Sequence, residues 1–215
     1  MSAPEKADAR EARAGDGSKA IARAAEVLGR RGLIAYPTET FSGIGADAFS
    51  ADAVARVFAL KGRPPDHPIP LILPDPAALE RVARAIPETA RRLAARFWPG
   101  PLTLVLLAAA DLPAAIAAGT GRVGVRVSSH PVARGTAVSF GGPITATSAN
   151  RSGREPPRSI GALDPAVAAG LDLLLDGGET PGGPPSTVLD VTCDPPRILR
   201  AGRVSESEIR AALGA

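Results

Sequence analysis

Apolar and polar positions along the chain recur with two periods, one typical of helices and one typical of strands. Residues 18–32 carry apolar side chains three and four positions apart, which predicts an amphipathic helix. The continuously apolar run 33–37 (LIAYP) predicts a buried strand. A second helix is expected to follow Ser50, a favourable N-cap residue, and to end at Gly62.

The same alternation of strands and helices continues to the C-terminus. Strands are expected at 69–74, 102–108, 122–129, 171–178 and 186–192, and residues 143–150 predict a short strand that runs into a polar loop. Helices are expected at 75–86, 87–100, 130–140 and near 160–169, and residues 197–215 predict a last strand or turn and a closing helix. This order is typical of an α/β domain with a mixed sheet and flanking helices. Residues 1–17 mix both charge signs and are expected to be a flexible leader, which places the domain at 18–215.

Composition excludes several classes of protein. Hydrophobic residues make up 45% of the chain, enough for a packed core, and the single Cys193 excludes an internal disulfide or a Cys-x-x-Cys site. The longest apolar run, LTLVLLAAA, is too short to span a bilayer, and the N-terminus lacks the apolar core of a signal peptide. We therefore expect a cytoplasmic protein without a membrane partner.

The residue inventory also limits the chemistry. Only His67 and His130 are present, each beside a proline, so a Ser-His-Asp triad or a zinc site is poorly supported. The segment GIGADA fits the loose dinucleotide pattern, but PTETFS separates it from the preceding strand. With 3% aromatic residues and a net charge of +3, a base-stacking surface for single-stranded nucleic acid is not expected.

Lys61 is the most informative cation. Only three of the 25 basic residues are lysines, and the other two lie in the N-terminal region. Lys61 sits at a predicted helix end, two residues before Arg63. Such a pair suits a polyphosphate, because lysine supplies a compact charge and arginine can form two parallel hydrogen bonds. The alternative is that both cations only balance the dipole of the helix C-terminus.

Two further segments carry polar groups at predicted strand ends. TATSAN (145–150) crowds hydroxyl and amide groups that could hold phosphate or sugar oxygens, although a polar turn capped by Asn150 explains it equally well. Arg126 occupies an apolar strand, where a buried charge requires either an internal carboxylate or a ligand anion. At a sheet edge it would simply lie in water.

Taken together and in order, seven segments resemble the YrdC-type threonylcarbamoyl-AMP synthase family. They span roughly residues 20–213 and read AYPTETFSGIGADA, VFALKGRPPDHPIPLIL, FWPGPLTLVL, VGVRVSSHP, ITATSANRSG, PSTVLDVT and ILRAG. The resemblance implies an α/β fold, with a YrdC-like twisted mixed sheet around a basic cavity. Three features differ from the family pattern: Ser42 replaces a usual aromatic residue, Arg122 replaces a frequent small hydroxyl residue, and PIPLIL lacks the polar residue that some members have near threonine.

The resemblance also implies a reaction. L-threonine, bicarbonate and ATP, with Mg²⁺ on the ATP phosphates, give threonylcarbamoyl-AMP and pyrophosphate. Partner proteins then transfer the threonylcarbamoyl group to adenosine 37 of tRNA (the t6A modification), and weak contact with tRNA or double-stranded RNA is possible. No metal ligand is assigned to a side chain.

Family roles can be transferred to matching positions of this sequence. The residues implied to bind L-threonine are Thr38, Thr40, Arg126 and Ser186. The residues implied to bind ATP are Lys61, Arg63, Ala146, Ser148, Asn150 and Arg200, with Lys61 and Arg63 as the catalytic pair. Two alternatives stay open: a non-catalytic RNA-binding YrdC-like module, and a related carbamoyl-transfer enzyme such as the YrdC-like domain of hydrogenase maturation proteins.

Overall fold

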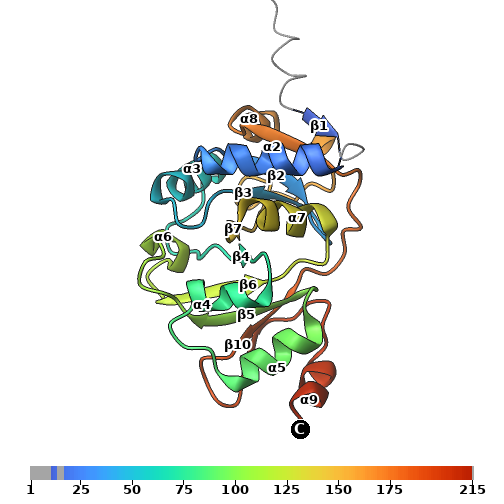
Figure 1. The fold of residues 1–215 in the computed structure, drawn as a ribbon. Helices are drawn as coiled ribbons and strands as arrows, with labels where there is room; N and C mark the ends of the chain where they lie inside the picture. Colours follow the sequence, from blue (N-terminus) through green and yellow to red (C-terminus); the bar gives the residue numbers. More distant parts are fainter. Residues whose placement is uncertain (1–10, 14–16, 215) are drawn as a thin grey trace, which may run out of the picture.

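The protein forms two mixed β-sheets with helices packed against them (Figure 1). The structure, a computed structural model, describes residues 11–13 and 17–214. The strands are β1 Glu11–Arg13, β2 Ile34–Pro37, β3 Ser42–Gly45, β4 Leu71–Ile72, β5 Leu102–Leu107, β6 Arg122–Arg126, β7 Ile144–Thr145, β8 Thr147–Ser148, β9 Leu173–Asp176, β10 Thr187–Asp190 and β11 Arg197–Arg200.

The helices are mostly short, and two of the connections are 3-10 turns. They are α2 Gly17–Gly29, α3 Ala51–Lys61, η2 Pro76–Ala78, α4 Leu79–Val82, α5 Glu88–Phe97, α6 Ala114–Ala117, α7 Pro131–Phe140, η3 Ile160–Ala162, α8 Pro165–Ala169 and α9 Glu206–Leu213. In Figure 1, α2 and α7 lie side by side over β2 and β3, and α5 packs on α9 at the far end. Among the described residues, no helix has the length and apolar character needed to cross a membrane.

Each sheet combines parallel and antiparallel pairs. The first sheet has the order β1-β9-β2-β3-β8, in which β9 is parallel to β1 and β2 while β3 is antiparallel to β2 and β8. The second sheet has the order β11-β10-β5-β6-β4-β7, with parallel pairs at β10–β5 and β6–β4. The expected α/β class with mixed pairing is therefore confirmed, and the strands are divided between two sheets.

The division between the sheets occurs at Ala146. The segment 143–150 was expected to be a short strand that runs into a polar loop, and the structure divides it into two short strands. It contributes β7 to the second sheet and β8 to the first. Between them, Ala146 N–H donates to Pro70 O (2.8 Å), which extends the register of β7 with β4 by one residue before the chain pairs with β3. The chain thus links the two sheets directly at this residue.

Local capping explains where α3 begins and ends. The Ser50 hydroxyl accepts from Ala53 N–H at its start, and Gly62 ends it in the left-handed region (φ 56°), as predicted. The helix expected at 75–86 is shorter, because only η2 and the single turn of α4 form there. Proline lowers helix propensity on both sides of this segment, at Pro76 and Pro87.

Two other expectations that concern strands of the first sheet need correction. Within the predicted leader 1–17, residues 11–13 form β1, which pairs in parallel with β9; residues 1–10 and 14–16 lie outside the described residues. The first three residues of GIGADA lie in β3 (Ser42–Gly45), which was not predicted as a strand. Its glycines face Tyr36, since a Cβ on Gly45 would lie 2.8 Å from the Tyr36 ring. Packing explains these glycines without a dinucleotide.

Candidate functional site

A cavity of about 730 Å³ lies between the two sheets. One wall comes from β3, β8 and the loop after β2, and the floor comes from β5, β6, β10 and β11 of the second sheet. Its size is within the range of cofactor and nucleotide sites. The lining carries a single carboxylate, Asp190, against five arginines, so the cavity is basic; these are Arg63, Arg122, Arg126, Arg197 and Arg200.

Strand periodicity explains why one face of the second sheet can build this floor. Side chains alternate between the two faces of a strand, so every second residue points into the cavity. On β5 these residues are Thr103 and Val105, and on β10 they are Val188 and Asp190. On β6 the floor residues are Arg122, Gly124 and Arg126. The intervening positions, such as Leu104, are buried in the core.

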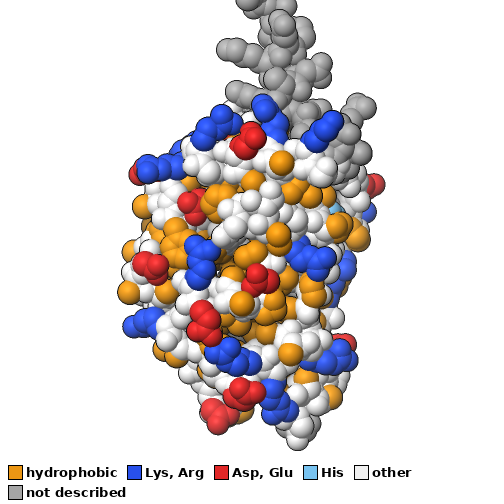
Figure 2. Space-filling model, in the orientation of Figure 1, with side chains coloured by type: hydrophobic (Ala, Val, Ile, Leu, Met, Phe, Trp, Pro, Cys, Tyr) orange, Lys and Arg blue, Asp and Glu red, His pale blue; other side chains and the backbone are white. Residues whose placement is uncertain are grey.

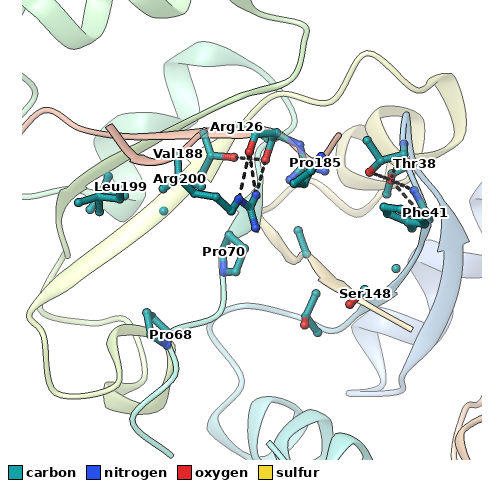
Figure 3. Close-up of a pocket in the computed structure, with 18 of the residues that line it drawn as sticks. Thr38, Phe41, Pro68, Pro70, Arg126, Ser148, Pro185, Val188, Leu199 and Arg200 are labelled. Carbon is teal, nitrogen blue, oxygen red and sulfur yellow. Dashed lines mark hydrogen bonds between the residues drawn. The ribbon is translucent and has the colours of Figure 1, made fainter. Parts of the chain in front are cut away.

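The loop after β2 places two threonine hydroxyls at one end of the cavity (Figure 3). Thr38 Oγ1 donates to Phe41 O (2.7 Å) and accepts from the N–H groups of Thr40 and Phe41, each at 3.3 Å. The hydroxyls of Thr38 and Thr40 lie 3.3 Å apart, and both side chains are buried in the cavity wall. The loop therefore presents two ordered hydroxyls to a small ligand.

Arg126 is a buried strand arginine that pairs with an internal carboxylate. Its Nε donates to Glu39 Oε1 at 2.9 Å, and the side chains of Arg126 and Glu39 are only 8% and 9% exposed. The Ser128 hydroxyl donates to Glu39 Oε2, so both carboxylate oxygens are occupied. The Nη atoms of Arg126 bond to no described residue, and Arg126 lines the cavity. They are available to a ligand anion.

The pKa of Glu39 reflects two opposing effects. Burial raises it, while the Arg126 charge and the Ser128 hydroxyl lower it, and the net pKa lies below its ordinary value. Glu39 is thus a carboxylate at neutral pH. Glu39 lies within PTETFS, and no role was predicted for it from the sequence. The signal that could have indicated it is Arg126, because a buried strand arginine needs a carboxylate partner.

Arg200 is hydrogen-bonded to Ser186, and both residues line the cavity. Arg200 Nη2 donates to Ser186 O (2.8 Å) and Oγ (3.2 Å), and Ser186 Oγ lies 2.9 Å from Thr103 Oγ1. Burial lowers the pKa of Arg200, and the nearby Arg126 charge lowers it further. These groups bring a second guanidinium close to Arg126, where a polyanion would relieve the repulsion.

Lys61 is held behind the cavity wall. It is 2% exposed, and its Nζ donates to the backbone carbonyls of Ser148 and of Asn150 (2.6 Å to the latter). Burial lowers the pKa of Lys61 to about 8, with a further contribution from Arg63. Lys61 therefore fixes the loop that presents Ser148 to the cavity.

Arg63 itself lines the cavity at the end of α3. Its Nη2 donates to Pro68 O (2.8 Å) and its Nε to His67 O (3.0 Å), while Nη1 lies 3.5 Å from Thr147 Oγ1. Burial lowers the pKa of Arg63. The guanidinium is thus fixed against the loop that precedes β4.

The structure gathers most of the sequence-predicted residues in one place. The residues that line the cavity are Thr38, Thr40, Arg63, Arg126, Ala146, Ser148, Ser186 and Arg200. Lys61 and Asn150 lie outside the lining. Asn150 Nδ2 donates to Arg151 O (3.0 Å) and Arg154 O, while its buried Oδ1 has no partner among the described residues.

Comparison with known proteins identifies the family. A family model for Sua5/YciO/YrdC, described as "Telomere recombination", matches residues 26–202. The threonylcarbamoyl-AMP synthase of Pyrococcus abyssi is 42% identical over 182 residues, which are 85% of this chain and 54% of that protein. The threonylcarbamoyl-AMP synthase of Bacillus subtilis is 38% identical over 195 residues, which are 90% of this chain and 56% of that protein.

A solved structure agrees with these matches. The crystal structure of P. abyssi Sua5 complexed with L-threonine is similar to this chain with a TM-score of 0.88 and 40% identity, covering 95% of this chain and 60% of that one. The chain spans about half the length of the curated relatives it matches. With the family model covering most of its sequence and a shared fold, the chain belongs to the Sua5/YciO/YrdC family.

Proposed function

We propose that this chain is a threonylcarbamoyl-AMP synthase, a nucleotidyltransferase that joins L-threonine, bicarbonate and ATP and releases pyrophosphate. The observation that carries the proposal is the convergence of the Thr38–Thr40 loop, Arg126 and Arg200 on one cavity. The relatives named for this activity, and the complex of P. abyssi Sua5 with L-threonine, support it.

The threonine site in this proposal lies at the end of the cavity formed by the loop after β2. The free Nη atoms of Arg126 would bind the threonine carboxylate, since guanidinium and carboxylate pair in a bidentate manner. Thr38 and Thr40 would hold the amino acid through their hydroxyls, and Ser186, which lines the same cavity, would close this site.

The phosphate site in this proposal lies beside it, between β8 and β11. Arg63 and Arg200 would neutralise the triphosphate, and the Ser148 hydroxyl and Ala146 backbone line the wall between them. Lys61 and Asn150 belong to the same loop system, so we assign them to the phosphates as well. To contact the phosphates, Lys61 Nζ would have to give up at least one of its hydrogen bonds to the carbonyls of Ser148 and Asn150.

The chemistry needs no enzyme nucleophile. The threonine amine adds to CO2 from bicarbonate and loses a proton, which gives a carbamate. A carbamate oxygen then forms a bond to the α-phosphorus, the bond from that phosphorus to the β-phosphate oxygen breaks, and pyrophosphate leaves. Catalysis consists of holding the two anions together and neutralising their charge, the task for which Arg126, Arg63 and Arg200 are suited.

Mg²⁺ is the expected companion of ATP, and its ligands would be mainly phosphate oxygens. Among residues 17–214 no cluster of three or more His, Cys, Asp or Glu side chains could hold a metal alone. The buried, unpaired Oδ1 of Asn150 is an oxygen of the type that Mg²⁺ accepts, and it lies next to Ser148. When bound, the ion would supply charge neutralisation on the phosphates.

Partners follow from the product in this proposal. Threonylcarbamoyl-AMP would pass to proteins that modify adenosine 37 of tRNA, a cytoplasmic reaction. On the face shown in Figure 2, basic and acidic side chains are interspersed without a continuous basic stripe. This arrangement favours weak and transient contact with RNA over a stable complex.

The decisive experiment measures pyrophosphate release from ATP with threonine and bicarbonate omitted in turn. The proposal expects release only when both are present. Thr40→Val should raise the KM for threonine, because the hydroxyl is lost with little change in shape. Thr136→Val is the matched control, since Thr136 Oγ1 is buried with no partner among the described residues and lies outside the cavity. ATP hydrolysis indifferent to threonine, or equal effects of both variants, would contradict the proposal.

A further inference from the structure

Arg126 lines the cavity (Figure 3) and uses only one of its three side-chain nitrogens inside the protein. Its Nε donates to Glu39 Oε1 (2.9 Å), while both Nη atoms bond to no described residue. A guanidinium has five N–H donors, and four of them are on the Nη atoms. These four are the donors assigned above to the threonine carboxylate, so whatever holds Glu39 in place also decides how many of them remain for a ligand.

Glu39 contacts Arg126 through one oxygen only, although an arginine and a carboxylate often form two parallel hydrogen bonds. The reason is Ser128, whose hydroxyl donates to the second oxygen, Glu39 Oε2. Ser128 Oγ also accepts from His130 N–H (3.1 Å), which leaves its own hydrogen for Glu39. Ser128 is completely buried and lies outside the cavity lining. It can therefore affect a ligand only through Glu39 and Arg126.

The backbone around Arg126 does not depend on this hydroxyl. Arg126 O accepts from Leu73 N–H (2.8 Å), Val127 O accepts from Gly100 N–H (2.9 Å), and β6 is paired with both β4 and β5. Removing the hydroxyl would leave the strand in place but would deprive a buried carboxylate oxygen of its donor, which is costly. The donor next to Nε on the same guanidinium is Nη2. By turning onto Nη2, Glu39 would form a bidentate pair and draw Arg126 away from the cavity.

We propose that Ser128 is a positioning residue for amino-acid recognition. By holding Glu39 Oε2, it restricts Glu39 to Arg126 Nε and keeps both Nη atoms available in the cavity for a ligand carboxylate. This inference rests on the proposed function for the identity of that ligand, L-threonine. Arg126 has a long side chain with several rotatable bonds, so fixing it before the ligand arrives lowers the entropic cost of binding.

Calorimetric titration of L-threonine, without ATP, into the parent protein and into Ser128→Ala tests this role. The substitution is expected to raise the Kd for L-threonine by about tenfold. L-threoninol, in which a hydroxymethyl group replaces the carboxylate, should show no difference between the two proteins. In turnover, the KM for threonine should rise while the KM for ATP stays the same. A crystal structure of Ser128→Ala should show Glu39 Oε2 within about 3.2 Å of Arg126 Nη2.

A double-mutant cycle shows whether Ser128 acts through Glu39. In Glu39→Gln the amide oxygen can still accept from Arg126 Nε, and the amide nitrogen is a donor that cannot pair with Nη2. Ser128→Ala should therefore leave the Kd for threonine unchanged when it is introduced into Glu39→Gln. A merely structural role for Ser128 would weaken threonine binding equally in both backgrounds.

Thr187→Val is the matched control. Thr187 is also completely buried and outside the cavity lining, and its Oγ1 donates to Val204 O (2.6 Å) and accepts from Val204 N–H (3.0 Å). It should lower the Tm as Ser128→Ala does, but leave the Kd for threonine unchanged. Ser128→Cys keeps a weak donor in a similar volume and gives a second reading if Ser128→Ala fails to fold. Its Kd for threonine should also exceed that of the parent.

The inference is overturned by any of three results. They are an unchanged Kd for threonine in folded Ser128→Ala, an equal loss of affinity for threonine and ATP, and a crystal structure in which water replaces the hydroxyl while Glu39 and Arg126 keep their positions. If pyrophosphate release never depends on threonine, the proposed function fails. The crystal structure of Ser128→Ala still decides whether the hydroxyl holds Glu39 away from Nη2.

Discussion

Removing the Glu39 carboxylate should destabilise the protein strongly, because it would leave Arg126 buried and uncompensated. Both side chains are more than nine-tenths buried, and Arg126 Nε lies 2.9 Å from Glu39 Oε1. Breaking such a pair from one side costs about 3–5 kcal/mol. For a domain of this size we therefore expect Glu39→Ala to lower the Tm by about 6–20 °C. Glu39→Gln should cost less, since glutamine can still accept from Arg126 and donate to Ser128.

Thermal and urea unfolding measure this effect, with Glu80→Ala as the matched control. Glu80 forms an ion pair of similar length with Arg91 (2.8 Å), but its side chain is 63% exposed. An exposed pair contributes only about 0.2–1 kcal/mol. If Glu39→Ala were as stable as Glu80→Ala, the buried pair would contribute no more to stability than an exposed one.

A double substitution separates the attraction between Glu39 and Arg126 from the free-energy cost of burying their charges. Replacing both partners by apolar residues, as in Glu39→Leu with Arg126→Met, removes the unpaired charge as well as the attraction, and such replacements are often close to neutral. The double variant should therefore be more stable than Glu39→Ala alone. A double variant that loses as much as the sum of the two single substitutions would refute this reasoning.

The stability that Glu39 contributes should decrease at acidic pH. The pKa of Glu39 is lowered in the folded protein, so its stabilisation is complete above the unfolded pKa of about 4.3 and is lost as the pH falls through the lower folded pKa. The urea midpoint of the parent should therefore fall more steeply than that of Glu39→Gln below about pH 4. Parallel curves would contradict the assignment.

Two further predictions concern the proposed activity. Because the pKa of Lys61 is lowered to about 8, kcat/KM for ATP should fall above about pH 8, and Lys61→Arg, which stays charged, should move this loss to higher pH; an unchanged profile would exclude Lys61 as its source. Excess chelator should abolish pyrophosphate release, and added Mg²⁺ should restore it, while threonine binding measured without ATP stays the same; release that persists in chelator would contradict a role for Mg²⁺.

Much of the fold could be predicted from the sequence because its signals are local. The N-cap at Ser50 and the left-handed Gly62 act within one turn of α3, so the residues around them are sufficient to set its bounds. The strand at β3 was missed for the opposite reason. Its glycines are explained by the Tyr36 ring on the neighbouring strand, a contact that no local pattern contains.

The candidate site shows the same division. The segments that carry hydroxyls and cations could be found without the structure, since PTET, KGRP, TSAN and LRAG are polar groups at the ends of apolar runs. Their partners could not: Arg126 pairs with Glu39, 87 positions away, and Lys61 donates to the Ser148 and Asn150 carbonyls instead of pointing into the open cavity. Such pairings depend on strand register and on the change of sheet at Ala146, which arise from packing of the whole chain.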